Sequence, residues 1–280
     1  MGILDDKIQL RRGKTPQGGG RNYNHNSKDL QTAIYNANGY KQSLFFVSSF
    51  GKSKQNSIAF LVYMTQENTL SIKTKDGTKV PFNSAVDKVN EWVDDTKKRK
   101  GANRFTMHLV LQSLPGADAK RAEKGFQEFL KKEFPKNDYL YAFHIDKESP
   151  HAHVTVKMQN TDGKKITAQK KELYEWRESL AVEMRGQGFR VAATSRQSRG
   201  LTGKSLPMSS GIKFKMHSKE LKQSIERNHD KENITKWRER YEKMSQLLNE
   251  SNDPKLKSIG EKIASFNKKL TKNYEKQITK

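Results

Sequence analysis

Three histidines lie within a stretch of ten residues, and their spacing predicts a metal site. His151 and His153 are separated by one residue, so on a β-strand their side chains point to the same face. His144 stands near the end of the preceding apolar segment, and an antiparallel hairpin would bring it beside this pair. Three converging neutral imidazoles can hold a metal ion and leave further positions open for a phosphate oxygen and water. A structural role for these histidines is the alternative.

Asp146 lies in the turn between the two expected strands of this hairpin. Its carboxylate is placed either to orient an imidazole N–H or to handle a proton during a reaction. If His144 is not the third metal ligand, the role falls to Asp146 or to His108, another of the seven histidines.

The apolar pattern around these residues predicts an α+β fold. Two strands joined by a short turn must be antiparallel, so we expect a mostly antiparallel five-stranded sheet with packed helices. A helix is also expected to begin at Ser84, with Asp87 completing a capping box. The expected strands are residues 44–47, 105–112, 139–145, 152–158 and 189–193, and the other helices are residues 57–66, 119–133 and 170–185.

The composition divides the chain into three parts. Residues 1–40 are polar and basic, which predicts a flexible N-terminal segment. Residues 41–205 contain the α+β elements, and residues 206–280 begin with a Gly/Ser/Pro-rich linker. Apolar residues spaced by three and four on both sides of Pro254 then predict a C-terminal helical hairpin. This hairpin either caps the core or docks a partner.

The charge of the chain indicates a polyanionic partner. Lys and Arg number 54 against 31 Asp and Glu, a formal net charge of +23, and this excess favours nucleic acid. The alternative is a lysine-rich solvated surface. There is no cysteine, which excludes disulfides and thiolate metal sites and is compatible with the cytoplasm. No apolar run approaches the roughly 18 to 20 residues that cross a bilayer, so no membrane insertion is expected.

The motif HIDKESPHAHV at residues 144–154 resembles the histidine motif of relaxases of the HUH endonuclease superfamily, in the P-type and agrobacterial T-DNA group. A second block, residues 45–76, resembles the first motif of these relaxases, in which a basic turn precedes a helix with the nucleophilic tyrosine. The matching residue here is Tyr63. A third block, residues 173–181 followed by residues 196–200, resembles the region after the histidine motif. The similarity spans about residues 43–200.

The resemblance implies a palm-like HUH fold and a nuclease that cuts one strand at an origin of transfer. Tyr63 would attack the phosphate with help from Mg²⁺ or Mn²⁺ and remain joined to the DNA as a 5′-phosphotyrosine. Such enzymes serve conjugation or plasmid mobilisation in the bacterial cytoplasm, where they work with single-stranded DNA, accessory relaxosome proteins and a type IV secretion coupling protein. Some relatives carry two tyrosines in this motif, whereas Tyr63 has no close second.

Tyr63 has a plainer interpretation as a tyrosine of the core or the surface. Its neighbours Ile58, Leu61, Val62 and Thr65 are expected to form the buried side of the helix, which places Tyr63 at the edge of that side. Tyr35 and Tyr40 are the competing tyrosines, and both precede the first expected strand.

Basic residues near these motifs are the expected phosphate contacts, which position DNA without reading its sequence. They are Lys52, Lys54, Lys97, Lys98, Arg99, Lys100, Arg104, Arg196 and Arg199.

Two other functions remain open at this stage. A rolling-circle replication initiator of the same superfamily would use similar chemistry, but its tyrosine normally follows the histidine motif, and Tyr174 is the candidate for that position. A non-catalytic basic nucleic-acid-binding protein would use the histidines for structural zinc.

Overall fold

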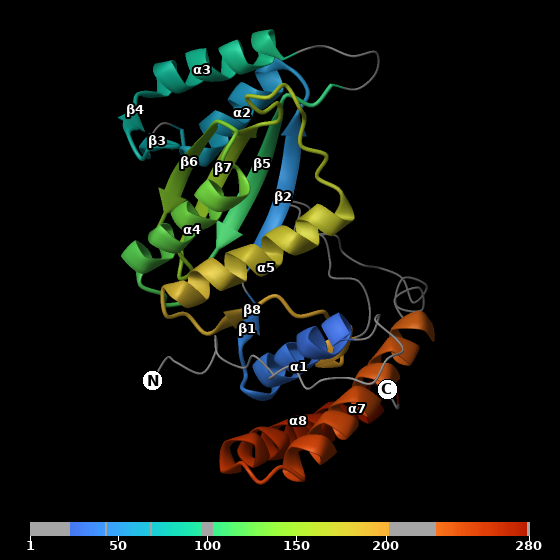
Figure 1. Ribbon diagram of the computed structural model, residues 1–280. Helices are drawn as coiled ribbons and strands as arrows, with labels where there is room; N and C mark the ends of the chain where they lie inside the picture. The colour runs from blue at the N-terminus through green and yellow to red at the C-terminus, as the bar shows by residue number, and fades with distance from the viewer. Residues whose placement is uncertain (1–22, 43, 68, 97–102, 202–227, 279–280) are drawn as a thin grey trace. The chain divides into compact units, whose positions relative to one another are not determined.

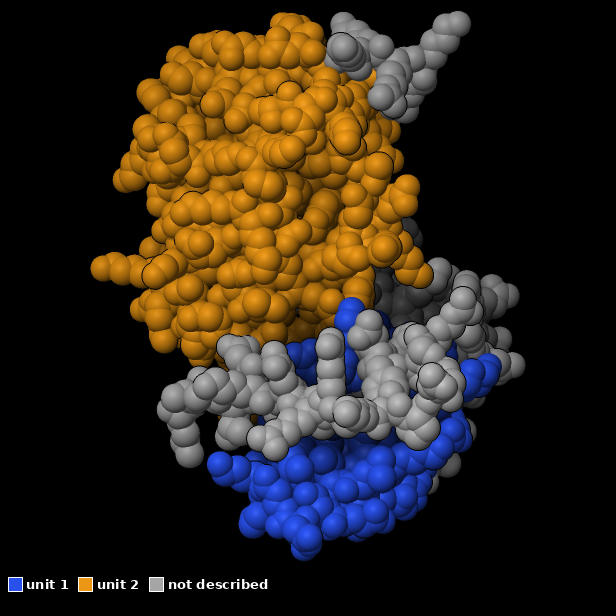
Figure 2. Space-filling view, viewed as in Figure 1, with its two compact units in different colours: residues 1–40, 194–280 blue, residues 41–193 orange. Residues whose placement is uncertain are grey.

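The computed structural model describes residues 23–42, 44–67, 69–96, 103–201 and 228–278. The chain forms two compact units, coloured separately in Figure 2. Unit 1 comprises residues 1–40 and 194–280, and unit 2 comprises residues 41–193. Within the described residues, no helix has the length and apolar character needed to span a membrane.

Unit 2 is built on an antiparallel sheet (Figure 1). In the described residues the sheet has six strands in the order β2-β5-β7-β6-β3-β4, and every neighbouring pair is antiparallel. This confirms the expected α+β fold with a mostly antiparallel sheet. The strands are β2 (Leu44–Gly51), β3 (Ile72–Thr74), β4 (Lys79–Val80), β5 (Thr106–Gln112), β6 (Tyr139–His144) and β7 (His151–Lys157).

The expected count of five strands in one sheet is wrong in two respects. The β3–β4 hairpin was not expected, because its strands are only three and two residues long and mostly polar. The last expected strand is reduced to β8 (Val191–Ala192), which pairs in parallel with β1 (Lys41–Gln42) in a separate two-stranded sheet. Because β1 and β8 lie far apart in the sequence, no local sequence pattern predicts that they pair.

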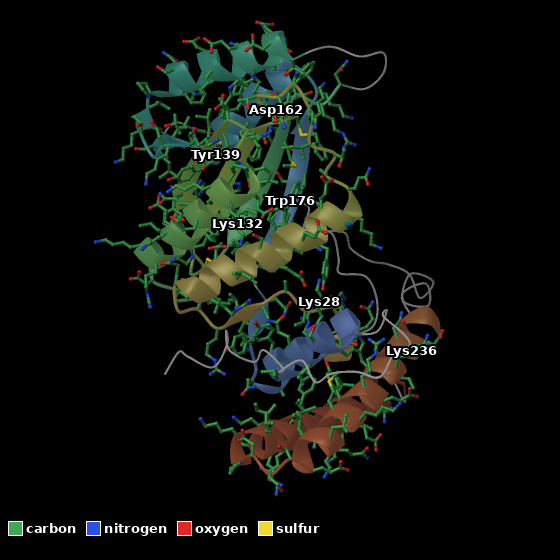
Figure 3. The ribbon with its side chains drawn as sticks, in the orientation of Figure 1. Lys28, Lys132, Tyr139, Asp162, Trp176 and Lys236 are labelled. Carbon is green, nitrogen blue, oxygen red and sulfur yellow. The ribbon has the colours of Figure 1, made fainter. Side chains whose placement is uncertain are left out.

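Helices cover both faces of the main sheet (Figure 1). Helices α4 (Ala119–Glu133) and α5 (Lys170–Gly186) pack on one face, where Trp176 of α5, labelled in Figure 3, contributes to the core. Helices α2 (Lys54–Met64) and α3 (Phe82–Asp95) lie on the other face. Each apolar side chain buried between these layers stabilises the fold by about 1.5 to 3 kcal/mol.

Strand β7 alternates between the two layers. Ala152, Val154 and Val156 belong to the core under α4 and α5. The residues between them, His151, His153 and Thr155, therefore point to the opposite face, where α2 lies. All six are buried, so this strand places two imidazoles beneath a helix instead of in solvent.

Helices α2 and α3 differ in detail from the expected pattern. The buried residues of α2 are Ser57, Phe60, Leu61 and Met64, and Val62, expected to be buried, is 38% exposed. The small Ser57 is accepted in the core because its hydroxyl is hydrogen-bonded, which shifts the buried face by one residue. The expected capping box at Ser84 is also wrong, since α3 begins at Phe82 after Pro81 and no side chain caps it.

Unit 1 contains α1 (Tyr23–Ala37), the short 3₁₀ helix η1 (Gln197–Arg199), α7 (Asn228–Asn249) and α8 (Pro254–Ile278). Ala33 of α1 is buried with Ile234 and Tyr241 of α7 and with Ile263 and Leu270 of α8. The expectation of flexibility over residues 1–40 is therefore wrong for residues 23–37, because helices distant in sequence cover them. Residues 1–22 and residues 202–227, where the expected linker before the hairpin falls, lie outside the described residues.

Candidate metal and nucleophile site

The hairpin of β6 and β7 brings the three histidines together. In its register His144 lies opposite His151, and Ala142 lies opposite His153. The ring centroids of His144 lie 4.8 Å from His151 and 4.7 Å from His153, and those of His151 and His153 are 5.3 Å apart. One nitrogen from each ring lies within 4.8 Å of the others. The three imidazoles thus converge as the spacing predicts.

The surroundings of the histidines keep them neutral. His144 is 3% exposed, and His151 and His153 are each 6% exposed. Burial lowers the pKa of His144 and of His151, and it lowers the pKa of His153 to about 3, with the two neighbouring imidazoles adding to the effect. At neutral pH all three rings therefore carry a lone pair, the form that binds a metal ion.

Backbone carbonyls fix which nitrogen two of the rings offer. The Nε2–H of His144 donates to the carbonyl of Met64 at 2.7 Å, which leaves Nδ1 with the lone pair. The Nδ1–H of His151 donates to the carbonyl of Ser149 at 3.2 Å, which leaves Nε2. The buried Nδ1 of His153 has no hydrogen-bond partner in the described residues.

These observations fit a divalent metal ion. A buried nitrogen without a hydrogen-bond partner destabilises the folded protein, and a metal ion bound at this position would offset that cost. Three nitrogen donors suit first-row transition ions, whereas Mg²⁺ prefers oxygen ligands. Of the two ions expected from the sequence, Mn²⁺ therefore matches this donor set better.

Tyr63 lies beside the histidines, in the last turn of α2. Its side chain is 56% exposed, and its ring meets that of His153 edge to face, with centroids 5.1 Å apart. The ring also lies 5.8 Å from Phe60, which is buried. The ring of Tyr63 is thus held between Phe60 and His153 while more than half of the residue stays exposed.

Both ends of α2 are anchored to the sheet. At the C-terminal end, the carbonyl of Met64 accepts the hydrogen bond from His144. At the N-terminal end, Ser53 caps the helix, and the hydroxyls of Ser57 and Thr106 are 2.9 Å apart. Gly51 permits this close approach, because a Cβ at this position would lie 2.1 Å from the Thr106 hydroxyl and 2.2 Å from that of Ser57. The position of Tyr63 relative to the histidines is thus set by both ends of its helix.

Gln66 links the tyrosine helix to Asp146. Its side-chain amide donates to the Asp146 carboxylate at 3.0 Å and to Nδ1 of His144 at 3.3 Å. The backbone of Gln66 and of Glu67 is left-handed, with φ of 48° and 57°, an uncommon conformation for residues other than glycine. Gln66 was not among the residues predicted from the sequence, because no local sequence pattern indicates that backbone conformation.

Asp146 stands at the rim of the cluster with its side chain 42% exposed. One carboxylate oxygen lies 3.9 Å from Nδ1 of His144. Partial burial raises the pKa of Asp146, but the Gln66 hydrogen bond and the nearby histidines outweigh it, and the pKa is lowered. The group is therefore a carboxylate at neutral pH. Within the described residues the Tyr63 hydroxyl has no hydrogen bond to it.

His108 is not part of the cluster of three. Its two ring nitrogens contact the hydroxyls of Ser49 at 2.8 Å and Thr106 at 3.0 Å, and its ring stacks on Phe60 with centroids 3.9 Å apart. Burial lowers its pKa to about 4. These contacts occupy both nitrogens, so His108 has a packing role: its ring supports α2 by stacking on Phe60.

The basic residues expected to contact DNA have different positions. Lys52 and Arg104 are exposed, and the Arg104 guanidinium lies over the ring of Phe50 at 4.1 Å. Lys54 forms an ion pair with Asp94 at 2.7 Å, which partly occupies its charge. Arg196 and Arg199 belong to unit 1, whereas residues 97–100 lie outside the described residues.

The competing tyrosines lie elsewhere. Tyr35 and Tyr40 belong to unit 1, and Tyr35 is only 7% exposed. Tyr174 is 45% exposed, but it lies on α5, which packs on the face of the sheet opposite to the histidines. Of the tyrosines considered from the sequence, Tyr63 is the one whose ring contacts the histidine cluster.

Comparison with known proteins adds one family match. Residues 63–185 match the family model of the MobA/VirD2-like relaxase nuclease domain, which confirms the resemblance inferred from the motifs. A solved chain described under the molecular basis of vancomycin resistance transfer in Staphylococcus aureus is 16% identical. That match has a TM-score of 0.39 and covers 55% of this chain and 99% of the other, a likeness too weak to carry an argument. No curated protein matches the sequence.

Proposed function

We propose that this protein is a DNA relaxase that cuts one DNA strand with Tyr63 and stays covalently joined to it. Its residues 63–185 match the nuclease domain of MobA/VirD2-like relaxases. The observation that carries the proposal is the half-exposed Tyr63 ring against His153 of the buried triad. A nucleophile and a phosphate-activating centre in contact are what a transesterase needs.

Each group of the site has a role in this proposal. His144, His151 and His153 would hold a divalent ion, which would neutralise charge on the scissile phosphate. The oxygen of Tyr63 forms a bond to phosphorus while the bond from phosphorus to the 3′ oxygen breaks. The tyrosine proton leaves to solvent or a base, and the departing 3′ oxygen gains a proton. The number of phosphoester bonds is unchanged, so the reverse reaction reseals the strand.

Asp146 is proposed as an orienting group. A carboxylate whose pKa is lowered is a weak base for a tyrosine, whose ordinary pKa is about 10. The same carboxylate lies near His144 and accepts a hydrogen bond from Gln66. Asp146 and Gln66 together would hold the His144 side of the site in place, and the Gln66 amide would give up its hydrogen bond to Nδ1 of His144 when that nitrogen binds an ion.

The substrate is proposed to be single-stranded DNA at an origin of transfer. Lys52 and Arg104 would contact its phosphates beside α2, and residues 97–100 and Arg196 and Arg199 remain candidates for further contacts. We propose further that the protein serves plasmid mobilisation or conjugation in the bacterial cytoplasm, with accessory relaxosome proteins and a type IV secretion coupling protein as partners, a proposal supported by the match to a relaxase nuclease domain. The parts of the chain would be residues 1–40, the nuclease region 41–205, and a linker with a hairpin over 206–280.

The test uses a single-stranded oligonucleotide from the origin of the protein's own element, supplied with Mn²⁺. A shifted protein–DNA adduct on a denaturing gel is expected for the unchanged protein and for Tyr174→Phe. Tyr63→Phe should give none, although it folds and binds DNA, because a phenyl ring cannot form the ester. An adduct that survives in Tyr63→Phe and disappears in Tyr174→Phe would favour a replication initiator. Strand cutting without any adduct would mean that water is the nucleophile.

A further inference from the structure

The outward face of α8, in unit 1, carries a concentrated positive charge. With 3.6 residues per turn, the buried Ile263 and Leu270 mark the inner side of this helix. The exposed side chains described on the rest of the helix surface contain a single acidic residue, Glu261. Its exposed lysines are Lys255, Lys257, Lys262, Lys268, Lys269 and Lys272.

Helix α7, in the same unit, shows the contrast. Its exposed basic and acidic residues are interspersed, and two of its cations are paired. Lys236, labelled in Figure 3, lies 2.5 Å from Glu232, and Arg240 lies 3.4 Å from Asp29. No ion pair in the described residues involves a lysine of α8. Two cations of α7 are thus paired within the described residues, whereas the α8 lysines form no ion pair there and, of their side chains, only that of Lys262 has a hydrogen bond there, at 3.5 Å to the Asn38 side chain.

We propose that this lysine face of α8 binds the phosphate backbone of double-stranded DNA, separately from the nicking site. From Lys255 to Lys272 the face extends over about 26 Å at 1.5 Å per residue. At about 3.4 Å per phosphate it can follow roughly seven phosphates of one strand. Lysine is a flexible point charge, which suits contacts without sequence preference.

The face is less suited to other anionic surfaces. A helix that lies on a membrane buries large apolar side chains beside its cations, whereas the exposed residues described on α8 are Lys, Ser, Glu and Pro254. The choice of DNA over RNA rests on the proposed function, but the charge of the face does not. Binding to a duplex without a nick site therefore tests this proposal even if Tyr63 is not the nucleophile.

The experiment measures binding of the full chain to a short DNA duplex of arbitrary sequence at several salt concentrations. The variant Lys255→Gln, Lys262→Gln, Lys269→Gln removes three charges that lie seven residues apart along one line of α8. The matched control, Lys120→Gln, Lys124→Gln, Lys171→Gln, removes the same charge from α4 and α5 of unit 2. Glutamine retains helix propensity close to that of lysine, so both variants should fold.

The α8 variant should bind the duplex more weakly and with a shallower salt dependence. Three lost contacts at about 0.9 each change the slope of log affinity against log salt by up to about 2.7. The affinity ratio between the unchanged chain and this variant then narrows by about fortyfold between 50 and 200 mM salt. The control should move the slope much less, and nicking of a short single-stranded oligonucleotide should continue in both.

Two outcomes overturn the proposal. Equal loss of binding in the two variants would mean that net charge alone matters, and tighter binding to duplex RNA than to duplex DNA would exclude DNA as the partner.

A substitution that should strengthen DNA binding provides a second test of the proposal. Glu261→Lys, which completes the lysine face, should strengthen binding and steepen the slope, whereas Glu175→Lys on α5 should not. No gain from Glu261→Lys over Glu175→Lys would contradict the proposal.

Discussion

Gly51→Ala tests how the sheet positions the tyrosine helix. The added Cβ would lie 2.1 Å from the Thr106 hydroxyl and 2.2 Å from the Ser57 hydroxyl. Ordinary contacts lie near 3.5 Å, so each hydroxyl must retreat by about 1.3 Å. Overpacking of this kind costs about 1 to 3 kcal/mol. It also breaks the hydrogen bonds from Ser57 to the Ser53 carbonyl and to Thr106, at about 1 kcal/mol each.

The free energy of unfolding should therefore fall by about 3 to 5 kcal/mol. Because Ser57 belongs to the helix that carries Tyr63, adduct formation should also slow at temperatures where the variant is folded. Gly186→Ala is the matched control, since a Cβ there meets nothing within 4 Å and the residue is not among the glycines with positive φ. That control should be neutral or stabilising by up to about 1 kcal/mol.

The assay is urea unfolding followed by tryptophan fluorescence. The chain has three tryptophans, and Trp237 lies in unit 1, so a Trp237→Phe background leaves Trp92 and Trp176 to report on unit 2 alone. If Gly51→Ala is as stable as Gly186→Ala and forms the adduct at the same rate, the close approach of β2, β5 and α2 is not what positions Tyr63.

Three further predictions concern the residues around Tyr63. His153→Ala should weaken Mn²⁺ binding, measured by calorimetry, by at least about tenfold while DNA affinity is retained, since phosphate contacts dominate it; unchanged Mn²⁺ affinity would remove His153 from the ligands. Because His108 has a folded pKa of about 4 against about 6.5 unfolded, stability should fall by up to about 3 kcal/mol as pH drops through that window. His108→Phe should remove the His108 contribution and leave the part due to His144, His151 and His153, and an unaltered pH profile of unfolding would contradict the assignment. Gln66→Ala should slow adduct formation by about tenfold at saturating DNA, a change of about 1.4 kcal/mol in the barrier, and an unchanged rate would show its contacts to be incidental.

The histidine hairpin could be predicted because the residues that determine it lie next to one another in the sequence. A His-x-His spacing on a strand, a turn, and an upstream histidine need only two-residue periodicity and antiparallel pairing to converge. The long helices α4 and α5 were equally predictable from their apolar periodicity. The family resemblance supplied Tyr63, which spacing alone did not single out.

The rest depended on contacts between distant segments. Helix α1 is held by α7 and α8, which no window of residues 1–40 reveals. Gln66, whose hydrogen bond to Asp146 spans 80 positions of the sequence, lies where two consecutive residues have positive φ. The buried face of α2 was misassigned at Val62, since hydrogen bonds to Thr106 and Ser53 let the polar Ser57 take a core position.

The central claim is that Tyr63 becomes covalently joined to the cut strand. The most direct measurement is mass spectrometry of the protease-digested adduct formed with the origin oligonucleotide and Mn²⁺, identifying the residue that carries the nucleotide. The account predicts a 5′-phosphotyrosine at Tyr63, whose exposed ring lies against His153. A nucleotide attached to Tyr35, Tyr40 or Tyr174 would contradict it.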